Sequence, residues 1–367
     1  MKKILKSPYF YLFALTPAGL ALCAAAKYVP GFADWYCVNI YKPVAGALGT
    51  VTGAFPLSLM EIAIAAAVFA VIALSIGAAL RAHRGEASVL KAFGTVLKKI
   101  LAGASVVFFL FALFCGTNYY RTSFAETVGL KVQKSSVDEL FALCSDLLER
   151  ANSLSTQLEH DENGVTVYPE SDFAMAKLAA GEYRLLYEKY PFLEMGKSTL
   201  GRPKPVICSF VMSKTLISGV YSPYTLEANV CREGPDFLRG FTMMHEQTHL
   251  RGFMNEAEAN FVAFLACENS ADPYFEYSGY CHALLNSMNA LYSADYEKWA
   301  QLRVCYSPEV DADMRAQNAY VDANESKVSE VSDAVNDAYL KLNSQTDGVQ
   351  SYGMVVDLLL AYYRTKA

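Results

Sequence analysis

The segment HEQTHLRGFMNEAEANF, residues 245–261, combines histidines and glutamates at a spacing that suits metal chemistry. Residues four apart lie on the same face of a helix, so His245 and His249 can direct two imidazole rings to one point. A tetrahedral zinc ion needs this arrangement of its first two ligands. Glu246 projects beside such an ion, where its carboxylate can take a proton from the water that zinc activates. The H-E-x-x-H spacing therefore predicts two zinc ligands and a catalytic base.

A catalytic zinc ion generally has three protein ligands and one open position. Gly252 can end the first helix with a left-handed turn, so that Asn255 starts a second helix. Glu256 is the first glutamate of that second helix and can return to the metal. Glu258 points about 200° away around the helix and stays the alternative ligand if the helix starts later.

The alternative to a metal site is a polar helix that happens to contain two histidines. The chain has five histidines in all, so a chance H-E-x-x-H is rare. The residues LRGFTMM before the motif are mostly apolar and indicate a buried helix, on which a metal site can be preorganised. We therefore expect one Zn²⁺ ion at this segment.

A tyrosine or histidine often stabilises the oxyanion that forms when the activated water attacks a carbonyl group. Tyr277, Tyr280 and His282 follow the second predicted helix and are the candidates for this role. The chain has 24 tyrosines, so packing is the alternative role of each tyrosine.

Three apolar stretches early in the chain have the length and composition of membrane-spanning helices. They are residues 9–29, 62–80 and 100–118. For the first stretch, a cleaved signal peptide is the alternative interpretation. Lysines and arginines cluster before the first stretch and between the second and third, which favours a cytoplasmic location for both segments. Residues 1–119 are thus predicted to be a membrane domain with an outer loop over about 30–56.

Residues 120–367 have the composition of a soluble domain and are expected outside the membrane, after an odd number of spans. Apolar residues at helical spacing, separated by turn-rich segments, predict a mainly helical domain. Helices are expected over 136–154, 173–193, 237–251, 255–268, 277–293, 308–343 and 350–364. The segment 205–230 is rich in β-branched and aromatic residues, with breaks at Gly219 and Pro223, and predicts one or two strands.

Charge and cysteine content exclude some classes of protein. The formal net charge is −6, and no basic stripe is present to neutralise phosphates, so we expect no nucleic-acid partner. The nine cysteines form no C-x-x-C pair, which argues against a cysteine zinc knuckle or a thioredoxin-like centre. One or two disulfides in the later region are compatible with an extracytoplasmic location.

The motif resembles that of the gluzincin-type membrane metallopeptidases related to the CAAX prenyl proteases. In those enzymes a second helix carries E-x-x-A-[DN], and its first glutamate is the third zinc ligand. Residues 256–260, EAEAN, match this pattern, with Asn260 where aspartate is usual. The resemblance implies Glu256 as the third ligand and Asn260 as its hydrogen-bonding support, although His249 and Glu256 are closer in the chain than is usual in gluzincins.

The chain also resembles a family of uncharacterised bacterial membrane proteins, domain of unknown function 3810. The matching segments are SGVYSPYTLEANV at 218–230, the motif at 245–267, YSGY at 277–280 and SYGMVVDLLLAYYR at 351–364. This resemblance implies a zinc metallopeptidase and brings no substrate with it.

Together these patterns predict a mainly α protein with three N-terminal transmembrane helices and a mostly helical, zincin-like extracytoplasmic domain that has a small β-sheet. We expect a multi-pass protein of the bacterial cell membrane, with a cytoplasmic N-terminus, that hydrolyses peptide bonds of a peptide or protein. The alternatives are a non-catalytic, zinc-stabilised sensor or binding protein and a scaffold that binds no metal. Neither substrate identity nor oligomeric state follows from the sequence.

Overall fold

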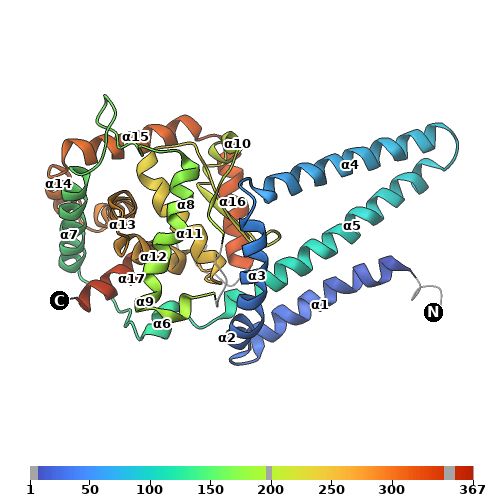
Figure 1. The fold of residues 1–367 in the computed structure, drawn as a ribbon, viewed down its shortest axis with the longest axis horizontal. Helices are drawn as coiled ribbons and strands as arrows, with labels where there is room; N and C mark the ends of the chain where they lie inside the picture. The colour runs from blue at the N-terminus through green and yellow to red at the C-terminus, as the bar shows by residue number, and fades with distance from the viewer. Residues whose placement is uncertain (1–6, 196–200, 343–351, 367) are drawn as a thin grey trace.

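The computed structural model describes residues 7–195, 201–342 and 352–366. It is mainly helical, and three of its helices are long and apolar enough to cross a membrane: α1 (Pro8–Tyr28), α4 (Leu59–His83) and α5 (Val89–Phe114). They coincide closely with the three predicted spans, and the third apolar segment continues beyond α5 to Tyr120 through a 3-10 turn, η2 (Gly116–Tyr120). Figure 1 shows them projecting from one side of a globular body. The chain is therefore built as a membrane protein.

The spans form a group in which α5 packs against both α1 and α4. Ser58 and Ser88 cap the N-termini of α4 and α5 by accepting hydrogen bonds from backbone N–H groups of the first turn. The turn between α4 and α5 and the start of α1 lie at the same end of the group, away from the globular body (Figure 1). The basic residues near that turn, such as Arg84, are thus separated from the globular body by the length of the spans.

The segment between the first two spans, about 30–56, is largely helical, which the sequence did not indicate. The segment forms α2 (Phe32–Tyr36), a π-helical turn η1 (Cys37–Tyr41) and α3 (Lys42–Gly53). Tyr36, Cys37 and Tyr41 are buried there together with residues of the later region. This tertiary packing, which local composition does not encode, orders the segment.

The globular body surrounds a buried central helix. α12 (Glu256–Glu268) is buried along most of its length and contacts α11 (Arg239–Leu250), α13 (Pro273–Ala294) and α17 (Tyr352–Arg364). α7 (Val137–Ser155) packs on the outer side of α13. The remaining helices and 3-10 turns are α6 (Phe124–Val128), α8 (Asp172–Glu182), η3 (Tyr183–Leu185), α9 (Leu186–Lys189), η4 (Pro191–Leu193), α10 (Ser209–Ser213), η5 (Asp236–Leu238), α14 (Tyr296–Arg303), α15 (Pro308–Asn324) and α16 (Lys327–Leu342).

The segment predicted to hold one or two strands contributes to three short ones. They are β1 (Lys204–Pro205), β2 (Gly219–Ser222) and β3 (Glu227–Val230), in the order β1-β3-β2. β2 pairs antiparallel with β3, Gly219 opposite Val230, and α11 packs on both strands. β2 is therefore an edge strand beside the H-E-x-x-H helix.

Two predicted helices are interrupted in the structure. The helix expected over 173–193 is divided into α8, η3, α9 and η4, because Tyr190 leaves the helical conformation. The single helix expected over 308–343 is two helices, α15 and α16, because Glu325 is extended and Ser326 starts a new helix by accepting from the Val328 N–H. Residue 343 and residues 350–351 of the last predicted helix lie outside the described residues. All nine cysteines are free thiols, so neither of the one or two disulfides that the sequence allows is formed.

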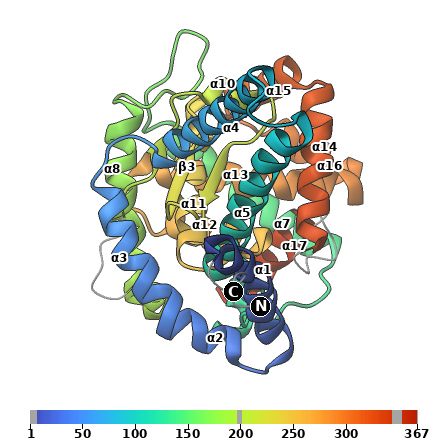
Figure 2. The ribbon, with the colours of Figure 1, turned by 90° about the vertical axis from the view of Figure 1, so that its right-hand side faces the viewer.

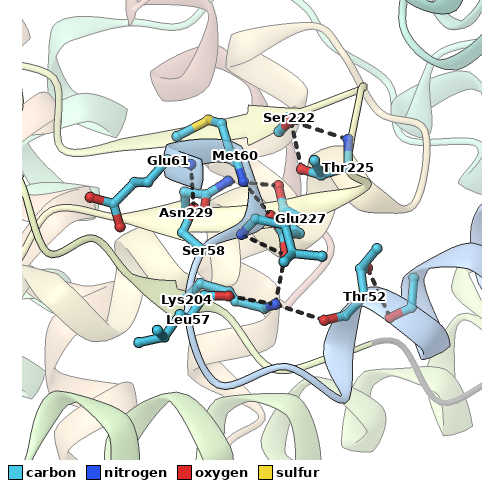
Figure 3. Close-up of polar contacts among 12 residues, drawn as sticks. Thr52, Leu57, Ser58, Met60, Glu61, Lys204, Ser222, Thr225, Glu227 and Asn229 are labelled. Atoms are coloured by element: carbon cyan, nitrogen blue, oxygen red, sulfur yellow. Dashed lines mark hydrogen bonds and ion pairs between the residues drawn. The ribbon is translucent and has the colours of Figure 1, made fainter. Parts of the chain in front are cut away.

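The regions predicted as 1–119 and 120–367 share a polar junction at the start of α4 (Figure 3). Lys204 and Glu227 form a buried ion pair, Nζ to Oε1 2.6 Å, with each side chain only 1% exposed. The Glu227 carboxylate also accepts from the N–H groups of Leu59 and Met60, at 3.3 and 3.0 Å. Ser58 Oγ donates to Asn229 Oδ1 at 2.6 Å. The β-sheet is thereby joined directly to the first turn of a membrane helix.

Candidate metal centre

The H-E-x-x-H segment lies on α11, which is buried on nearly all sides. The helix stops at Leu250, and Gly252 takes a left-handed conformation, φ +84°. Asn255 then caps α12 by accepting from the Glu258 N–H at 3.1 Å. The predicted pair of helices meeting at Gly252 is confirmed.

Three predicted ligands come together where α11 and α12 meet. The Nε2 atoms of His245 and His249 are 3.0 Å apart. Glu256 Oε2 is 3.2 Å from His245 Nε2, and Glu256 Oε1 is 3.6 Å from His249 Nε2. One ligand atom from each residue lies within 4.8 Å of the others. Two imidazole nitrogens and one carboxylate oxygen converging on a point make a donor set that suits zinc.

The His249 ring is held in one orientation. Its Nδ1 lies 2.7 Å from the backbone oxygen of Phe253, so Nδ1–H donates there and Nε2 is left with a lone pair facing the cluster. Burial lowers the pKa of His249 to about 4, which keeps the ring neutral at physiological pH. A neutral imidazole is the form that binds a metal.

The pKa values of His245 and Glu256 depend on each other. Burial alone would lower the pKa of His245, but the hydrogen bond and charge of Glu256 outweigh it and raise the pKa. Burial would raise the pKa of Glu256, but the two histidines lower it to about 2. The Glu256 carboxylate is therefore ionised beside both rings, as a ligand must be.

Glu246 is a buried carboxylate without a complete set of partners. Among the residues that the structure describes, its Oε2 has no hydrogen-bond partner. Burial raises its pKa to about 8, and Glu256 adds to the increase while His245 opposes it. The cost of burying such a group is high unless a partner completes it. A cation at the adjacent cluster, together with a water molecule, would complete it, so these residues fit a metal ion.

The two glutamates proposed as third ligand have different surroundings. Glu258 is turned away from the histidines, and its Oε1 accepts from the Phe124 N–H at 2.6 Å, at the start of α6. Glu256 is the carboxylate that joins the cluster. Asn260 is buried, and a hydrogen bond from its side chain is among the causes that raise the pKa of His245.

Two of the three oxyanion candidates point to other partners. Tyr277 donates to Asp313 Oδ2 at 2.6 Å, and Tyr280 donates to Glu268 Oε1 at 3.4 Å. His282 stacks on Phe241, ring centroids 3.6 Å apart. Phe241 in turn lies 6.2 Å from the His245 ring. Of the three, His282 is the one close to the cluster.

Two tyrosines beside the cluster were not predicted. The Tyr221 ring, on β2, lies 6.3 Å from the His249 ring. Its hydroxyl is 3.2 Å from that of Tyr41, which donates to the backbone oxygen of Leu250 at 3.1 Å. Tyr41 is far from the motif in sequence, and no spacing rule links them; Tyr221 lies in the SGVYSPYT segment, where composition gave no reason to single it out.

Two arginines fix the turn behind the cluster. Arg251 is fully buried, with its guanidinium 3.6 Å from the Tyr183 ring centroid and donating to the backbone oxygen of Gln247 at 2.6 Å. Arg121 follows the last apolar segment directly and donates to the backbone oxygen of Gly252 at 2.8 Å. The turn between the two ligand-bearing helices is thus held by a residue at the end of the membrane part.

The fold and site together define a membrane-spanning helical protein with a His-His-Glu cluster under an edge strand. The chain belongs to the family described as protein of unknown function DUF3810, whose model matches residues 36–360. The match includes α4, α5, the sheet and the whole cluster. No curated protein and no solved structure matches the chain.

Proposed function

We propose that the protein is a membrane-anchored, zinc-dependent metallopeptidase. One observation carries this proposal: the buried Glu246 has a carboxylate oxygen with no hydrogen-bond partner among the described residues, and it lies next to three converging ligand atoms of His245, His249 and Glu256. A structural metal site has no need of an uncommitted carboxylate beside its ligands, whereas a hydrolytic site needs a base.

Each residue of the site has a separate role in this proposal. His245, His249 and Glu256 would hold one Zn²⁺ ion, and when bound the ion supplies Lewis-acid chemistry that polarises a carbonyl and makes water more acidic. Glu246 would be ionised once a cation occupies the cluster, because a neighbouring positive charge lowers the pKa of a carboxyl group. Its carboxylate would then take a proton from the attacking water and return it to the leaving amine. Phe253 keeps the His249 ring in place through its backbone oxygen.

The neighbouring sheet supports an extended peptide as substrate. β2 lies at the edge of the sheet, and among the described strands only β3 pairs with it. A free strand edge can bind an extended peptide through main-chain hydrogen bonds. Gly219, at the start of β2, lies against the Glu246 carboxylate. A peptide along this edge would pass the proposed base.

We further propose that the site lies outside the cytoplasm of a bacterial cell. The support is the segregation of charge: the basic turn between α4 and α5 is at the opposite end of the spans from the globular body (Figure 1). Positive residues next to spans are retained on the cytoplasmic side.

The test is metal analysis and peptide hydrolysis by the full chain purified in detergent. The wild type should contain about one zinc per chain and should cleave members of a random peptide library. Glu246→Gln should keep the zinc and lose hydrolysis by about 10²- to 10⁴-fold. Normal turnover by Glu246→Gln would refute the role of the base. Stoichiometric zinc with no hydrolysis by the wild type would favour the sensor alternative.

A further inference from the structure

Six apolar side chains are exposed on the globular body where the spans leave it. They form two groups, which we call the apolar rim: Ile207, Phe210 and Val211 at α10, and Val328, Val331 and Val335 on α16. Exposed apolar surface of this kind marks an interaction site or a membrane contact. In Figure 2, which looks onto the side from which the spans project, α10 and α16 lie at the margins of the body around the spans.

The first group is attached to the N-terminal end of α4, where this helix meets the globular body. Glu61, in the first turn of α4, accepts from the N–H groups of Ile207 and Cys208 at 3.0 and 2.8 Å. The apolar part of α4 begins directly after Glu61. Phe210, 64% exposed, therefore lies beside the point where the apolar span starts.

The second group is fixed at the corresponding end of α5. Tyr339 of α16 packs against Phe111, ring centroids 6.1 Å apart, and its hydroxyl accepts from Tyr119 at 3.0 Å. Val328, Val331 and Val335 precede Tyr339 at helical spacing, so they share its face of α16. The exposed valine stripe thus continues the contact that α16 makes with a membrane helix.

The His-His-Glu cluster is close to the same end of α5. The Tyr221 hydroxyl donates to the backbone oxygen of Phe114, the last residue of α5, at 2.9 Å, while its ring lies beside His249. Cys115, directly after α5, donates a hydrogen bond from its Sγ to Met254 Sδ at 3.7 Å. Met254 lies two residues before Glu256. The Glu256 side chain is 26% exposed. The side chain of Tyr221 therefore bridges the ligand His249 and the end of α5.

We propose that the apolar rim rests on the bilayer surface, and that the site takes polypeptide presented at that surface, next to a membrane anchor or a lipid attachment. The bilayer is the occupant that the structure favours, because the rim is continuous with helices that are themselves built for lipid. The proposed class of substrate rests on the proposed function, whereas the contact between the apolar rim and the bilayer does not. Confinement of both molecules to one surface raises their effective concentration.

Tryptophan quenching by lipid tests the seating of the rim in the full chain. The chain has two tryptophans, Trp35 and Trp299, which are replaced by phenylalanine. Single tryptophans are then introduced as Phe210→Trp or Val331→Trp, with Val304→Trp as the control. Val304 is 83% exposed and follows α14, on the side of the body away from the spans (Figure 1).

In vesicles of dibrominated phosphatidylcholine, the tryptophans at 210 and 331 should be quenched by at least about half relative to unbrominated vesicles, and the tryptophan at 304 should not, because bromine quenches at short range within the acyl region. Equal, weak quenching at all three positions would overturn the seating of the rim. Quenching at 210 and 331 alone supports it, whatever the enzymatic activity.

Hydrolysis in the same vesicles tests the substrate class. A random peptide library is supplied in two forms, one with a palmitoyl chain at one end and one without. The zinc-loaded wild type should cleave the acylated form at least about tenfold faster at equal bulk concentration, and Glu246→Gln should cleave neither. Equal rates for the two forms would overturn the substrate class and leave the proposed function intact. No cleavage of either form would overturn both the proposed function and the substrate class, and the quenching result would still decide where the rim lies.

Discussion

Gly219 of the edge strand β2 lies directly against Glu246 of α11. A β-carbon at position 219 would be 2.8 Å from the carboxyl carbon of Glu246 and closer still to Oε1. Such overlap is not tolerated without movement of one group. The backbone of the strand is thus so close to the Glu246 side chain that a β-carbon at position 219 would overlap it, and glycine is the residue that permits this approach.

Gly219→Ala should therefore displace the Glu246 carboxylate while leaving the metal ligands in place. We expect hydrolysis to fall at least about tenfold, since misplacement of a catalytic group by about 1 Å can cost 10²-fold. Zinc content should stay unchanged. Initial rates and metal analysis of the purified variant measure both quantities.

Gly181→Ala is the matched control, because a β-carbon at that position in α8 meets nothing within 4 Å. It should keep full activity and stabilise the helix slightly. Equal loss of activity in both variants would show that the effect of Gly219→Ala does not come from Glu246.

The two glutamates of α12 separate metal binding from packing. Glu256→Gln removes the anionic ligand between His245 and His249 and should weaken zinc affinity at least about tenfold. Glu258→Gln keeps an oxygen that can accept from the Phe124 N–H and should bind zinc normally. Titration of each metal-free variant with zinc in the presence of a competing chelator gives the affinities. Weakened affinity in Glu258→Gln alone would reverse the assignment of the third ligand.

The local geometry of the site could be predicted from sequence, whereas its surroundings could not. Helical periodicity places His245 and His249 together, and Gly252 ends the helix by its backbone conformation, so both follow from residues close in the chain. Tyr41 and Gly219 reach the site through tertiary packing, which no local pattern records. The helices within 30–56 escaped prediction for the same reason, because their buried face contacts residues far along the chain.

The buried pair Lys204 and Glu227 should hold the sheet to the start of α4. Glu227→Ala leaves the Lys204 ammonium buried with backbone oxygens of Thr52 and Leu57 as partners, at 2.7 and 3.1 Å. Loss of one member of a buried ion pair typically costs about 3–5 kcal/mol of stability. Equilibrium unfolding in detergent measures the change.

The control for this prediction is an exposed ion pair of the same kind. Asp138, which pairs with Lys298, is 86% exposed, and Asp138→Ala should leave the unfolding midpoint almost unchanged. A Glu227→Ala protein as stable as Asp138→Ala would mean that the junction adds no stability.

Glu246 should make the stability of the metal-free protein depend on pH. Its pKa is raised by burial from 4.5 to about 8, so the folded state binds a proton that the unfolded state releases. The resulting stabilisation is fully present below pH 4.5 and is lost as the pH rises through about 8. At 1.36 kcal/mol per pKa unit, this stabilisation is on the order of 4–5 kcal/mol. Glu246→Gln cannot ionise, so the metal-free variant should lose less stability than the metal-free wild type between pH 5 and 9. Thermal unfolding of both proteins across this range measures the difference. Parallel curves of stability against pH would show that the Glu246 carboxyl does not hold a proton in the folded state.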